Sequence, residues 1–254
     1  MSSKTLTGGK KIIAVLPAYN AAKTLERTFN DIPKEWVSGI ILVDDASRDN
    51  TVEISRSLGI KTFVHSKNKG YGGNQKTCYK KALDLGADIV VMVHPDHQYD
   101  PKAIPQLIAP IIAGTADAVF GSRMAVRKNA LKGGMPYRKF IANIILTKTE
   151  NFILGLHLSE YHSGFRAYSK KVLQTVPFEE NSNDFVFDTE IIVQLRIGNF
   201  RVPEVPIETR YFPDASMIGL SKSVRYGFGI LRALVKYMLQ YLRIKRYKQY
   251  MLTP

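Results

Sequence analysis

Short apolar runs alternate with amphipathic stretches over the first half of the chain. Five runs are rich in β-branched residues and bounded by turn residues, at 12–17, 39–45, 60–65, 88–96 and 116–122. Nearly continuous apolarity of this kind is typical of strands buried on both faces of a sheet. The stretches between them, 21–31, 50–58, 71–86 and 101–113, have the length of helices. The pattern predicts an α/β fold with a mostly parallel sheet flanked by helices.

The alternation becomes irregular after Ser122. Residues 124–136 are basic and contain glycines, which predicts a mobile loop. Further helices are expected at 137–155, 169–175, 186–198 and 222–247, and a loop at 211–221. The prolines in 201–210 predict a strand near a sheet edge. We expect one catalytic domain over 10–221, followed by a basic amphipathic helix and tail over 222–254.

Composition is that of a globular protein with an unusual charge. The 254 residues are 45% apolar and 23% charged, which argues against intrinsic disorder. The net charge of +14 calls for an anionic partner such as nucleic acid, a phosphorylated small molecule or an acidic membrane. The single cysteine, Cys78, excludes an internal disulfide framework and a cysteine-based zinc site.

Two segments without acidic residues carry the whole charge excess. Seven cations lie between Gly121 and Lys148, and eight follow Asp214, whereas the remaining 21 cations nearly balance the 22 acids. No secretory signal precedes Pro17, and charges interrupt the apolar stretches at 140–158 and 224–244. The sequence therefore predicts a cytoplasmic protein without a transmembrane span.

Polar residues cluster where the predicted strands end, which is where parallel sheets bind ligands. These segments are Pro17–Asn20, Asp44–Asp49, His94–Gln98 and Gly121–Arg123. Asp96 and Gln98 offer hard oxygen ligands for Mg²⁺ or Mn²⁺ beside a diphosphate, or alternatively a turn before a helix. Asp44 and Asp45 suit a base and ribose hydroxyls, or alternatively cap a helix. Tyr19 suits stacking on a base, or burial against the sheet.

Four common active-site patterns are missing. The turn after the first strand has no glycine, so a Rossmann dinucleotide site is not supported. The glycines at 70, 72 and 73 follow the third strand and indicate a tight turn. The sequence has no Walker A motif and no G-x-S-x-G nucleophile elbow, and the five histidines lack zinc-site spacing.

Together the motifs resemble family two glycosyltransferases of the GT-A fold, over about Lys11 to Arg225. The branch they are most similar to is that of dolichyl-phosphate mannose or glucose synthases. The motifs are PAYN (17–20), VDDASRDNT (43–51), NKGYGGN (68–74), the D-x-Q of Asp96 and Gln98, GSR (121–123), YHSGFRAYS (161–169), FDTE (187–190), VPIETRYFP (205–213) and GLSK (219–222).

The resemblance implies a role for each matching residue. The nucleotide sugar would be bound by Pro17, Ala18, Tyr19, Asn20, Asp44, Asp45, Gly70, Asp96, Arg210, Ser221 and Lys222. Arg210, Ser221 and Lys222 would belong to a loop that closes over the diphosphate. The acceptor would be bound by Arg123, Arg138, Ser163, Gly164 and Arg166. Asp96 and Gln98 would hold Mg²⁺ or Mn²⁺. Asp96, Arg123 and Glu190 would be catalytic, with Glu190 in the sugar pocket.

The chain departs from the family pattern at two positions. His94 replaces the first aspartate of the usual D-x-D, which bears on metal binding and sugar choice. The aspartate that normally precedes the S-G-F-R stretch is matched by Glu160, or alternatively is absent. Members of this family often carry C-terminal transmembrane helices, and the 254 residues are expected to contain none.

The implied reaction is inverting transfer of a sugar from a UDP- or GDP-sugar to a polyprenyl or dolichyl phosphate. A phosphate acceptor is already anionic and needs cations, supplied by Arg123, Arg138 and the loop between them; that loop is alternatively a solvated basic surface. A saccharide hydroxyl acceptor remains an alternative, with Glu160 or Glu190 as its general base. A nucleic-acid-binding protein and a nucleotidyltransferase are more distant alternatives, because recognition motifs for the first are missing and fold does not settle function.

The last predicted helix has a cationic stripe. At about 100° per residue, Arg225, Arg232, Lys236 and Arg243 fall within about 20° of one line. Most other positions between Val224 and Ile244 are apolar. This pattern predicts peripheral contact with the anionic inner face of a membrane, or alternatively a subunit interface, so a homo-oligomer stays open.

Overall fold

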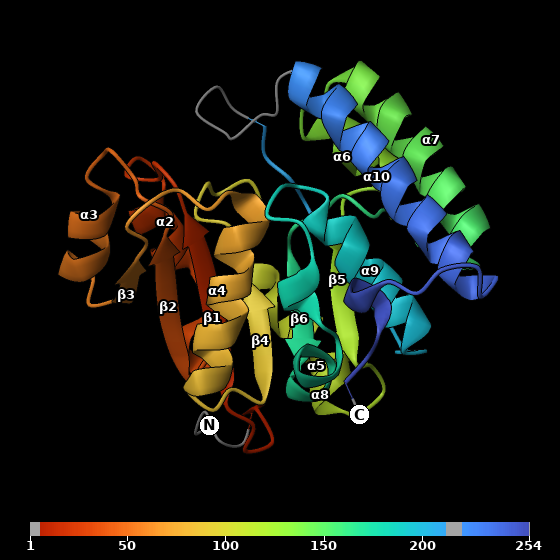
Figure 1. Cartoon of the computed structure of the whole chain (residues 1–254). Coiled ribbons are helices and arrows are strands. Elements are labelled where there is room, and N and C mark those ends of the chain that lie inside the picture. Colours follow the sequence, from red (N-terminus) through yellow and green to blue (C-terminus); the bar gives the residue numbers. More distant parts are fainter. Residues whose placement is uncertain (1–5, 212–219, 254) are drawn as a thin grey trace.

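The computed structural model of the protein describes residues 6–211 and 220–253, and for 220–222 the backbone alone. Within these residues a 7-stranded sheet forms the centre of the molecule, with the order β3-β2-β1-β4-β6-β5-β7 (Figure 1). Its strands are β1 (Ile12–Ala18), β2 (Gly39–Asp44), β3 (Lys61–Val64), β4 (Ile89–Met92), β5 (Ala118–Ser122), β6 (Arg166–Ser169) and β7 (Glu204–Pro206).

The strand order reverses direction at β1. Both neighbours of this strand, β2 and β4, run parallel to it, so the chain leaves β1 toward opposite sides of the sheet. Such a reversal opens a crevice at the carboxyl ends of the strands. Beyond β4 the sheet is mixed, because β6 runs antiparallel to both β4 and β5, whereas β7 pairs in parallel with β5 at the sheet edge.

Helices cover both faces of the sheet. The α-helices are α2 (Leu25–Asp31), α3 (Thr51–Ser57), α4 (Tyr71–Asp84), α5 (Ile104–Ile112), α6 (Arg127–Lys132), α7 (Tyr137–Leu154), α8 (Lys170–Thr175), α9 (Phe187–Ile197) and α10 (Leu220–Tyr241). Short 3-10 turns lie at Lys34–Trp36, Pro101–Ala103, Phe178–Glu180 and Lys248–Tyr250. The alternating side chains of β1 serve the two faces: Ile13 and Val15 pack toward α4 and α9, and Ile12 and Leu16 toward α2 and α5.

The predicted α/β fold is confirmed, with local differences. The strand β6 was not predicted, because its four residues include Arg166, whose buried charge interrupts the apolar pattern. The segment 124–136 was expected to be an irregular loop, but it contains α6. Met124, Ala130 and Met135 are buried there and form a small apolar cluster, which gives the segment its own packing.

The C-terminal helix also differs in extent from the prediction. It ends at Tyr241 rather than 247, and Arg243 lies beyond it with a φ of 59°. Arg243 is therefore not in register with Arg225 and Arg232. The helix packs against α7 and α9, and Ile230 and Leu234 join the main core. Across the described part of the chain no helix has the length and apolarity needed to cross a bilayer.

Candidate functional site

The loops after β1 and β2 are tied together at one side of the crevice. The side-chain oxygen of Asn20 accepts a hydrogen bond from the Arg48 backbone amide at 2.8 Å. The Asn20 amide donates to the Ser47 hydroxyl, also at 2.8 Å, and Asn20 has a φ of 51°. Tyr19 is held between these ties with 49% of its surface exposed, so its ring is available to a planar ligand. Pro17 and Ala18 end the strand beneath it.

Asp44 and Asp45 are both buried but differ in what they bind. One oxygen of Asp44 accepts from the Ser47 amide at 2.9 Å, and the other, Oδ1, is buried without a hydrogen-bond partner among the described residues. Asp45 is fully engaged by protein: its oxygens accept from the Lys69 and Gly70 amides and lie 2.7 Å from His65 Nδ1. An unsatisfied buried acceptor invites a ligand donor. Asp44 is therefore the better candidate for contacting a nucleoside, and Asp45 shapes the loop beside it.

Gly70 allows the loop after β3 to adopt its conformation. Its φ of 82° is unfavourable for other residue types, and a Cβ would lie 2.6 Å from the Asn183 carbonyl oxygen. Gly72 and Gly73 were expected to form a tight turn, but they lie in the first turn of α4. Their amides donate to the same Asn183 carbonyl at 2.9 and 3.3 Å. The glycines thus let α4 begin against the segment that precedes α9.

Asp96 and Gln98 follow β4 in a compact turn. The Gln98 amide donates to Asp96 Oδ1 at 3.1 Å, and between them His97 adopts a φ of 56°. The Asp96 carboxylate is half-buried and Gln98 is buried. In the described residues no three His, Cys, Asp or Glu side chains converge as a complete metal cage. One carboxylate and one amide oxygen nevertheless suit a Mg²⁺ or Mn²⁺ ion that takes its other ligands from phosphate and water.

His94, which stands where the resembled motif has an aspartate, is partly buried beside Tyr71. Its ring stacks on Tyr71 with 5.6 Å between ring centroids, and its Nε2 lies 3.4 Å from the Tyr71 hydroxyl. Burial lowers the pKa of His94, so the ring is neutral near pH 7. Gly164 makes room for it, because a Cβ on Gly164 would overlap His94 Nε2. His94 therefore supplies neither the charge nor the open oxygen of an aspartate.

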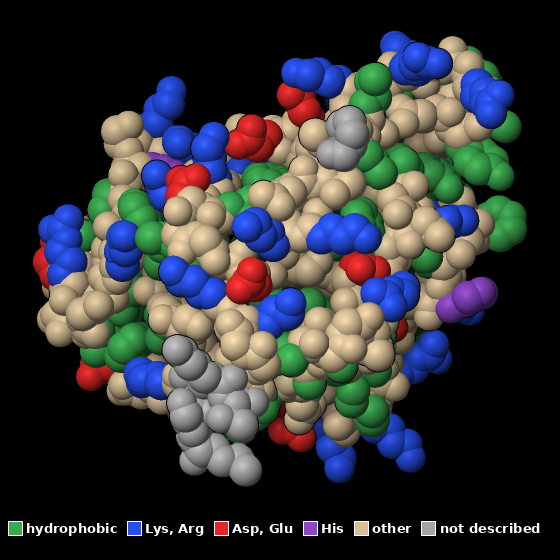
Figure 2. All heavy atoms as spheres, turned by 90° about the horizontal axis from the view of Figure 1, so that it is seen from below, with side chains coloured by type: hydrophobic (Ala, Val, Ile, Leu, Met, Phe, Trp, Pro, Cys, Tyr) green, Lys and Arg blue, Asp and Glu red, His purple; other side chains and the backbone are tan. Residues whose placement is uncertain are grey.

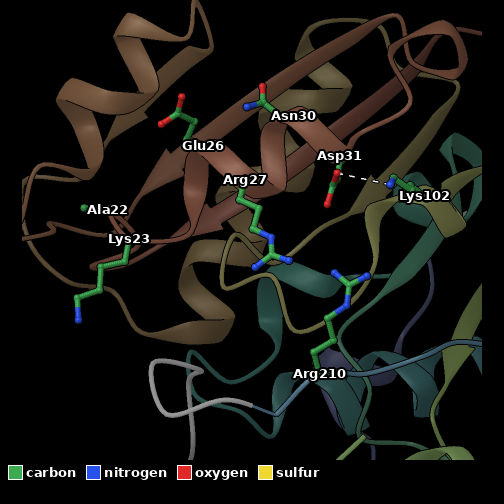
Figure 3. Close-up of a pocket in the computed structure, with 8 residues that line it drawn as sticks. All are labelled: Ala22, Lys23, Glu26, Arg27, Asn30, Asp31, Lys102 and Arg210. Atoms are coloured by element: carbon green, nitrogen blue, oxygen red, sulfur yellow. Dashed lines mark ion pairs between the residues drawn. The ribbon is translucent and has the colours of Figure 1, made fainter.

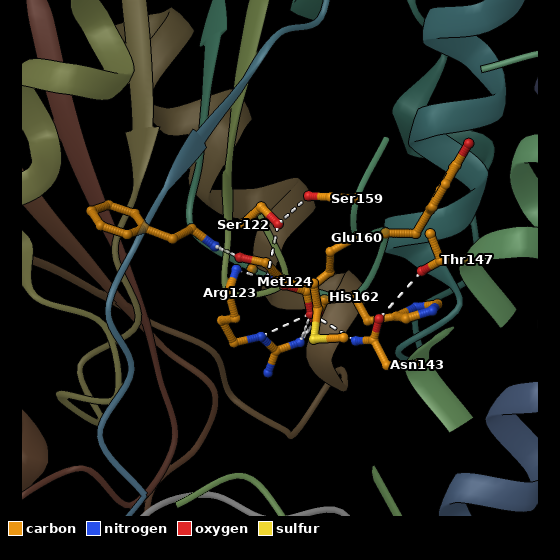
Figure 4. A network of polar contacts seen from close by, with 12 residues as sticks. Ser122, Arg123, Met124, Asn143, Thr147, Ser159, Glu160 and His162 are labelled. Atoms are coloured by element: carbon orange, nitrogen blue, oxygen red, sulfur yellow. Dashed lines mark hydrogen bonds and ion pairs between the residues drawn. The ribbon is translucent and has the colours of Figure 1, made fainter. Parts of the chain in front are cut away.

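Arg123 forms a buried ion pair with Glu160 next to the crevice (Figure 4). Its Nε donates to Glu160 Oε1 at 2.8 Å, its Nη2 to Glu160 and the His162 carbonyl, and its Nη1 to the Tyr211 hydroxyl. Burial would raise the pKa of Glu160, but the charge and hydrogen bonds of Arg123 outweigh it and hold that pKa below its usual value. The guanidinium is thus occupied by protein groups.

The expected acceptor cation Arg138 is exposed on α7, whereas its neighbour Lys139 turns inward. The Lys139 Nζ lies 5.3 Å from the centre of the Tyr211 ring. Burial and the charge of Arg123 lower the pKa of Lys139 to about 8, against the opposing charges of Glu160 and Asp96. Lys139 was not among the residues predicted from the sequence. Adjacent residues of a helix point in directions about 100° apart, so an exposed Arg138 leaves Lys139 free to face inward, and this periodicity could have identified it.

The remaining predicted acceptor residues are buried in a turn. Arg166 donates to the carbonyls of Ser163 and Tyr161, both at 2.7 Å, and pairs with Asp188 at 3.4 Å. The Ser163 hydroxyl accepts from the Phe165 amide at 3.3 Å. Arg166 therefore holds the 161–164 turn against α9 and is not directed into open space.

Glu190 was expected in the sugar pocket, but it turns the other way. Its carboxylate accepts from the Ser182 amide at 2.5 Å and from the Gln249 side chain at 3.2 Å, toward the C-terminal tail. Asp188, in the same FDTE motif, is the acid on the crevice side. It accepts from the Tyr71 hydroxyl at 2.8 Å and from Gln75 at 3.3 Å. Whether Asp188 or Glu190 faces the crevice depends on where α9 begins, and the FDTE motif does not reveal that position.

A polar hollow of about 540 Å³ adjoins the turn at His97 (Figure 3). Its lining residues are Ala22, Lys23, Glu26, Arg27, Asn30, Asp31, Lys102 and Arg210. In Figure 3 the guanidinium groups of Arg27 and Arg210 point toward each other across it. Arg210 pairs with Asp100 at 2.8 Å, and Asp31 lies 2.8 Å from His97 Nε2. The His97 hydrogen bond, together with the Lys102 charge, lowers the pKa of Asp31.

The proposed closing loop is only partly visible. Arg210 lies in the hollow, whereas Ser221 and Lys222 fall in the first turn of α10 and their side chains lie outside the described residues. Most of the predicted 211–221 loop also lies outside them.

Solved structures share this architecture. Glucosyl-3-phosphoglycerate synthase from Mycobacterium tuberculosis, solved in complex with Mn²⁺, UDP and glucosyl-3-phosphoglycerate, superposes with a TM-score of 0.69 at 18% identity, over 92% of this chain and 82% of that one. A second structure of that synthase, with Mg²⁺ and UDP, gives 0.69 at 20% identity over the same shares. The expected GT-A fold is thereby confirmed.

Sequence comparison identifies the family. A UDP-N-acetylglucosamine–dolichyl-phosphate N-acetylglucosaminyltransferase from Methanococcus voltae is 30% identical over 89% of this chain and 95% of its own length. An undecaprenyl-phosphate mannosyltransferase from Micrococcus luteus is 25% identical over 78% and 82%. The family model described as "Glycosyl transferase family 2" matches residues 13–176. With its motifs at the strand ends of a GT-A sheet, the chain belongs to glycosyl transferase family 2.

Proposed function

We propose that the protein transfers a sugar from a UDP- or GDP-sugar to the phosphate of a polyprenyl or dolichyl phosphate. Two relatives, from Methanococcus and Micrococcus, carry names that state lipid-phosphate acceptors, and they match most of this chain. The crevice at the strand ends is where a nucleotide sugar would bind in this fold. The chemistry of the residues around that crevice supports this choice of acceptor.

The observation that carries the proposal is an inward-facing cation beside acids, Glu160 and Asp188, that other protein groups already engage. Lys139 lies within electrostatic reach of Arg123, Glu160 and Asp96. A phosphate acceptor is anionic at neutral pH, so it needs a cation and no general base. In this proposal Lys139 contacts the acceptor phosphate, and Arg123 acts as a positioning residue through Glu160 and the His162 carbonyl.

The alternative acceptor, a saccharide hydroxyl, needs a general base. The acids expected for that role are both occupied: Glu160 pairs with Arg123, and Glu190 binds Ser182 and Gln249. Asp188 accepts from Tyr71 and Gln75. None of the three therefore offers the free, basic carboxylate that would favour this alternative.

For the donor, we propose that Tyr19 stacks on the base while Asp44 Oδ1 accepts a hydrogen bond from the nucleoside. Pro17, Ala18 and Asn20 hold the loop that presents Tyr19, and Asp45 with Gly70 holds the loop opposite. We place Arg210, in the polar hollow, beside the diphosphate end of the crevice. Ser221 and Lys222, which we expected in a loop over the diphosphate, lie in the first turn of α10, so any contact they make with the donor would come from the start of that helix.

Asp96 and Gln98 are the residues that would hold Mg²⁺ or Mn²⁺. The ion, when bound, neutralises charge on the leaving diphosphate. We expect Asp96→Ala to abolish Mn²⁺-dependent binding of UDP or GDP in calorimetry. The matched control is Asp84→Ala, at an exposed acid on α4. Unchanged metal-dependent binding in Asp96→Ala would contradict the assignment.

The proposed reaction is a single in-line displacement. An oxygen of the acceptor phosphate bonds to the anomeric carbon, and the bond from that carbon to the diphosphate oxygen breaks. The nucleoside diphosphate leaves with the electron pair, and the anomeric configuration inverts. Preorganised positive charge around both phosphates lowers the barrier.

Because the acceptor is a lipid, we propose that the enzyme works at the cytoplasmic face of a membrane as a peripheral protein. The division into a catalytic domain over 10–221 and a basic helix and tail over 222–254 is part of this proposal. A homo-oligomer is compatible with it, and nucleic acid is not among the expected partners.

The test is a transfer assay with a panel of UDP- and GDP-sugars, Mn²⁺ and a short polyprenyl phosphate. A parallel series offers the corresponding polyprenol and simple saccharides as acceptors. We expect one donor to give product with the polyprenyl phosphate alone. Transfer to a saccharide, or to no lipid phosphate with any donor, would refute the proposal.

A further inference from the structure

The helix α10 carries two separate apolar faces. The buried face holds Ile230, Ala233, Leu234 and Tyr237 and packs against the body of the protein. A second face, which is exposed, holds Val224, Phe228, Leu231 and Val235. At about 100° per residue this second set lies within about 60° and does not overlap the buried set. Packing onto the protein therefore leaves a complete apolar stripe uncovered, with Phe228 68% exposed.

The helix α7 repeats this arrangement. Its exposed apolar residues are Tyr137, Ile141, Ile145 and Phe152, which lie within about 80° of one another around the helix. Its buried positions, Asn143, Thr147, Glu150 and Leu154, lie on the opposite side. Phe152 is 90% exposed, which is unusual for so large an apolar side chain.

The two stripes belong to one side of the molecule. The helices α7 and α10 pack against each other and lie side by side at the right of Figure 1. Figure 2 shows hydrophobic side chains gathered along the same edge, with Lys and Arg among them. We call this surface the α7–α10 face and define it by the eight exposed residues named above. Exposed apolar side chains gathered on one side of a molecule mark an interaction site.

The charge around the α7–α10 face indicates what covers it. No acidic residue occurs between Asp117 and Glu150 or after Asp214, so neither helix presents an exposed acid. Exposed cations border the face at Arg138, Lys148, Arg225 and Arg232. Pairing with the same face of a second copy would set cations against cations. An anionic bilayer suits both the apolar residues and the cations of this face, because the apolar side chains can lie below the lipid headgroups while the cations lie among the headgroups.

The α7–α10 face is also connected to the acceptor side of the crevice. Lys139 extends inward from the same helix that presents Tyr137 and Ile141 outward. On α10, the Tyr226 hydroxyl lies 3.0 Å from Nδ1 of His162, whose carbonyl accepts from Arg123. A lipid phosphate lying in a bilayer against this face would be close to the cations that the proposed reaction requires.

We infer that the α7–α10 face docks the enzyme on an anionic lipid bilayer, with α7 and α10 both lying in the interfacial plane. The inference rests on the proposed function in one respect, which is that the acceptor is a lipid phosphate. It assigns to α7 an outward docking surface in addition to its inward-facing lysine.

The experiment measures flotation of the full chain with vesicles of phosphatidylglycerol and phosphatidylcholine that contain no polyprenyl phosphate. We expect binding that weakens with salt and falls strongly on pure phosphatidylcholine. The double variant Phe152→Glu with Phe228→Glu should bind at least about tenfold more weakly, because each change places a charge in the apolar layer. The matched control Val64→Glu, at an exposed apolar position on β3, should bind like the wild type.

The double variant should keep transfer to a short, water-soluble polyprenyl phosphate, which also shows that it folds. Vesicle binding and transfer are separate readouts, so absent transfer would refute the proposed function without affecting the docking result. Wild-type protein that does not float with anionic vesicles would overturn the inference. So would a dimer in ultracentrifugation that the double variant dissociates, because the face would then be an interface between copies.

Discussion

In the proposed function, Lys139 is the side chain that contacts the acceptor phosphate. Burial beside Arg123 lowers its pKa to about 8, so the ammonium group is charged below that pH and is lost above it. A charge-assisted hydrogen bond to a phosphate contributes about 1.5–3 kcal/mol, which corresponds to about tenfold or more in rate. Transfer to the phosphate acceptor should therefore decline as the pH rises through about 8.

Three variants test this role. Lys139→Ala should lower kcat/KM at pH 7 by about 10- to 100-fold, whereas Lys139→Arg should remain active at pH 9, because a guanidinium stays charged. Arg138→Ala is the matched control, since that neighbour is exposed, and it should behave like the wild type. An alkaline decline that persists unchanged in Lys139→Arg would count against the assignment.

The Arg123–Glu160 pair makes a different prediction. Either single change, Arg123→Met or Glu160→Gln, leaves one group buried without its partner and should lower the free energy of unfolding by about 3–5 kcal/mol. The double change should cost much less than the sum, because no unpaired charge remains. Urea unfolding of all four proteins measures this coupling. Additive losses would mean that the pair does not act as a unit and that Arg123 is free for phosphate.

At the scale of elements, a buried polar chain joins α7, α9 and α10. Glu150 accepts from the Thr189 hydroxyl at 3.1 Å, and its other oxygen lies 3.4 Å from His162 Nε2. His162 in turn contacts Tyr226. Burial raises the pKa of Glu150 to about 8, against the hydrogen bond from Thr189 and the charge of Arg166, and burial lowers that of His162 to about 4. Both groups are therefore neutral at pH 7.

This protonation state has a measurable consequence. Between the unfolded pKa near 4.5 and the folded value near 8, the folded state binds more protons, so stability falls as pH rises, by up to about 1.4 kcal/mol per unit. Glu150→Gln removes that dependence. Denaturant unfolding at pH 6 and pH 8.5 should show a smaller loss for the variant than for the wild type. Equal losses would contradict a neutral Glu150.

The elements also show what the sequence could predict. The strands β1, β2, β4 and β5 were predictable because both of their faces are buried, which leaves a continuous apolar run. The strand β6 was not, since its buried Arg166 is satisfied by carbonyls and Asp188 that only the folded chain brings near. For α6, no local pattern distinguished a short helix from a basic loop.

For the whole molecule, the segregation of charge was visible in the sequence, but its geometry was not. The two acid-free segments fold into neighbouring helices that share one face, although about 70 residues separate them. Site residues at strand ends were likewise predictable, because the topology brings those ends together. The sequence did not predict that Asp188 rather than Glu190, or Lys139 rather than Arg138, faces the crevice. Those choices depend on helix phase.

The central claim is that the sugar becomes bonded to a lipid phosphate, and phosphorus NMR of the reaction tests it most directly. Incubation with the accepted nucleotide sugar, Mn²⁺ and a short polyprenyl phosphate should convert the phosphomonoester signal of the acceptor into a phosphodiester signal. One nucleoside diphosphate should be released per product. An unchanged acceptor signal during donor consumption would contradict the account, because the sugar would then have gone to water or to a hydroxyl.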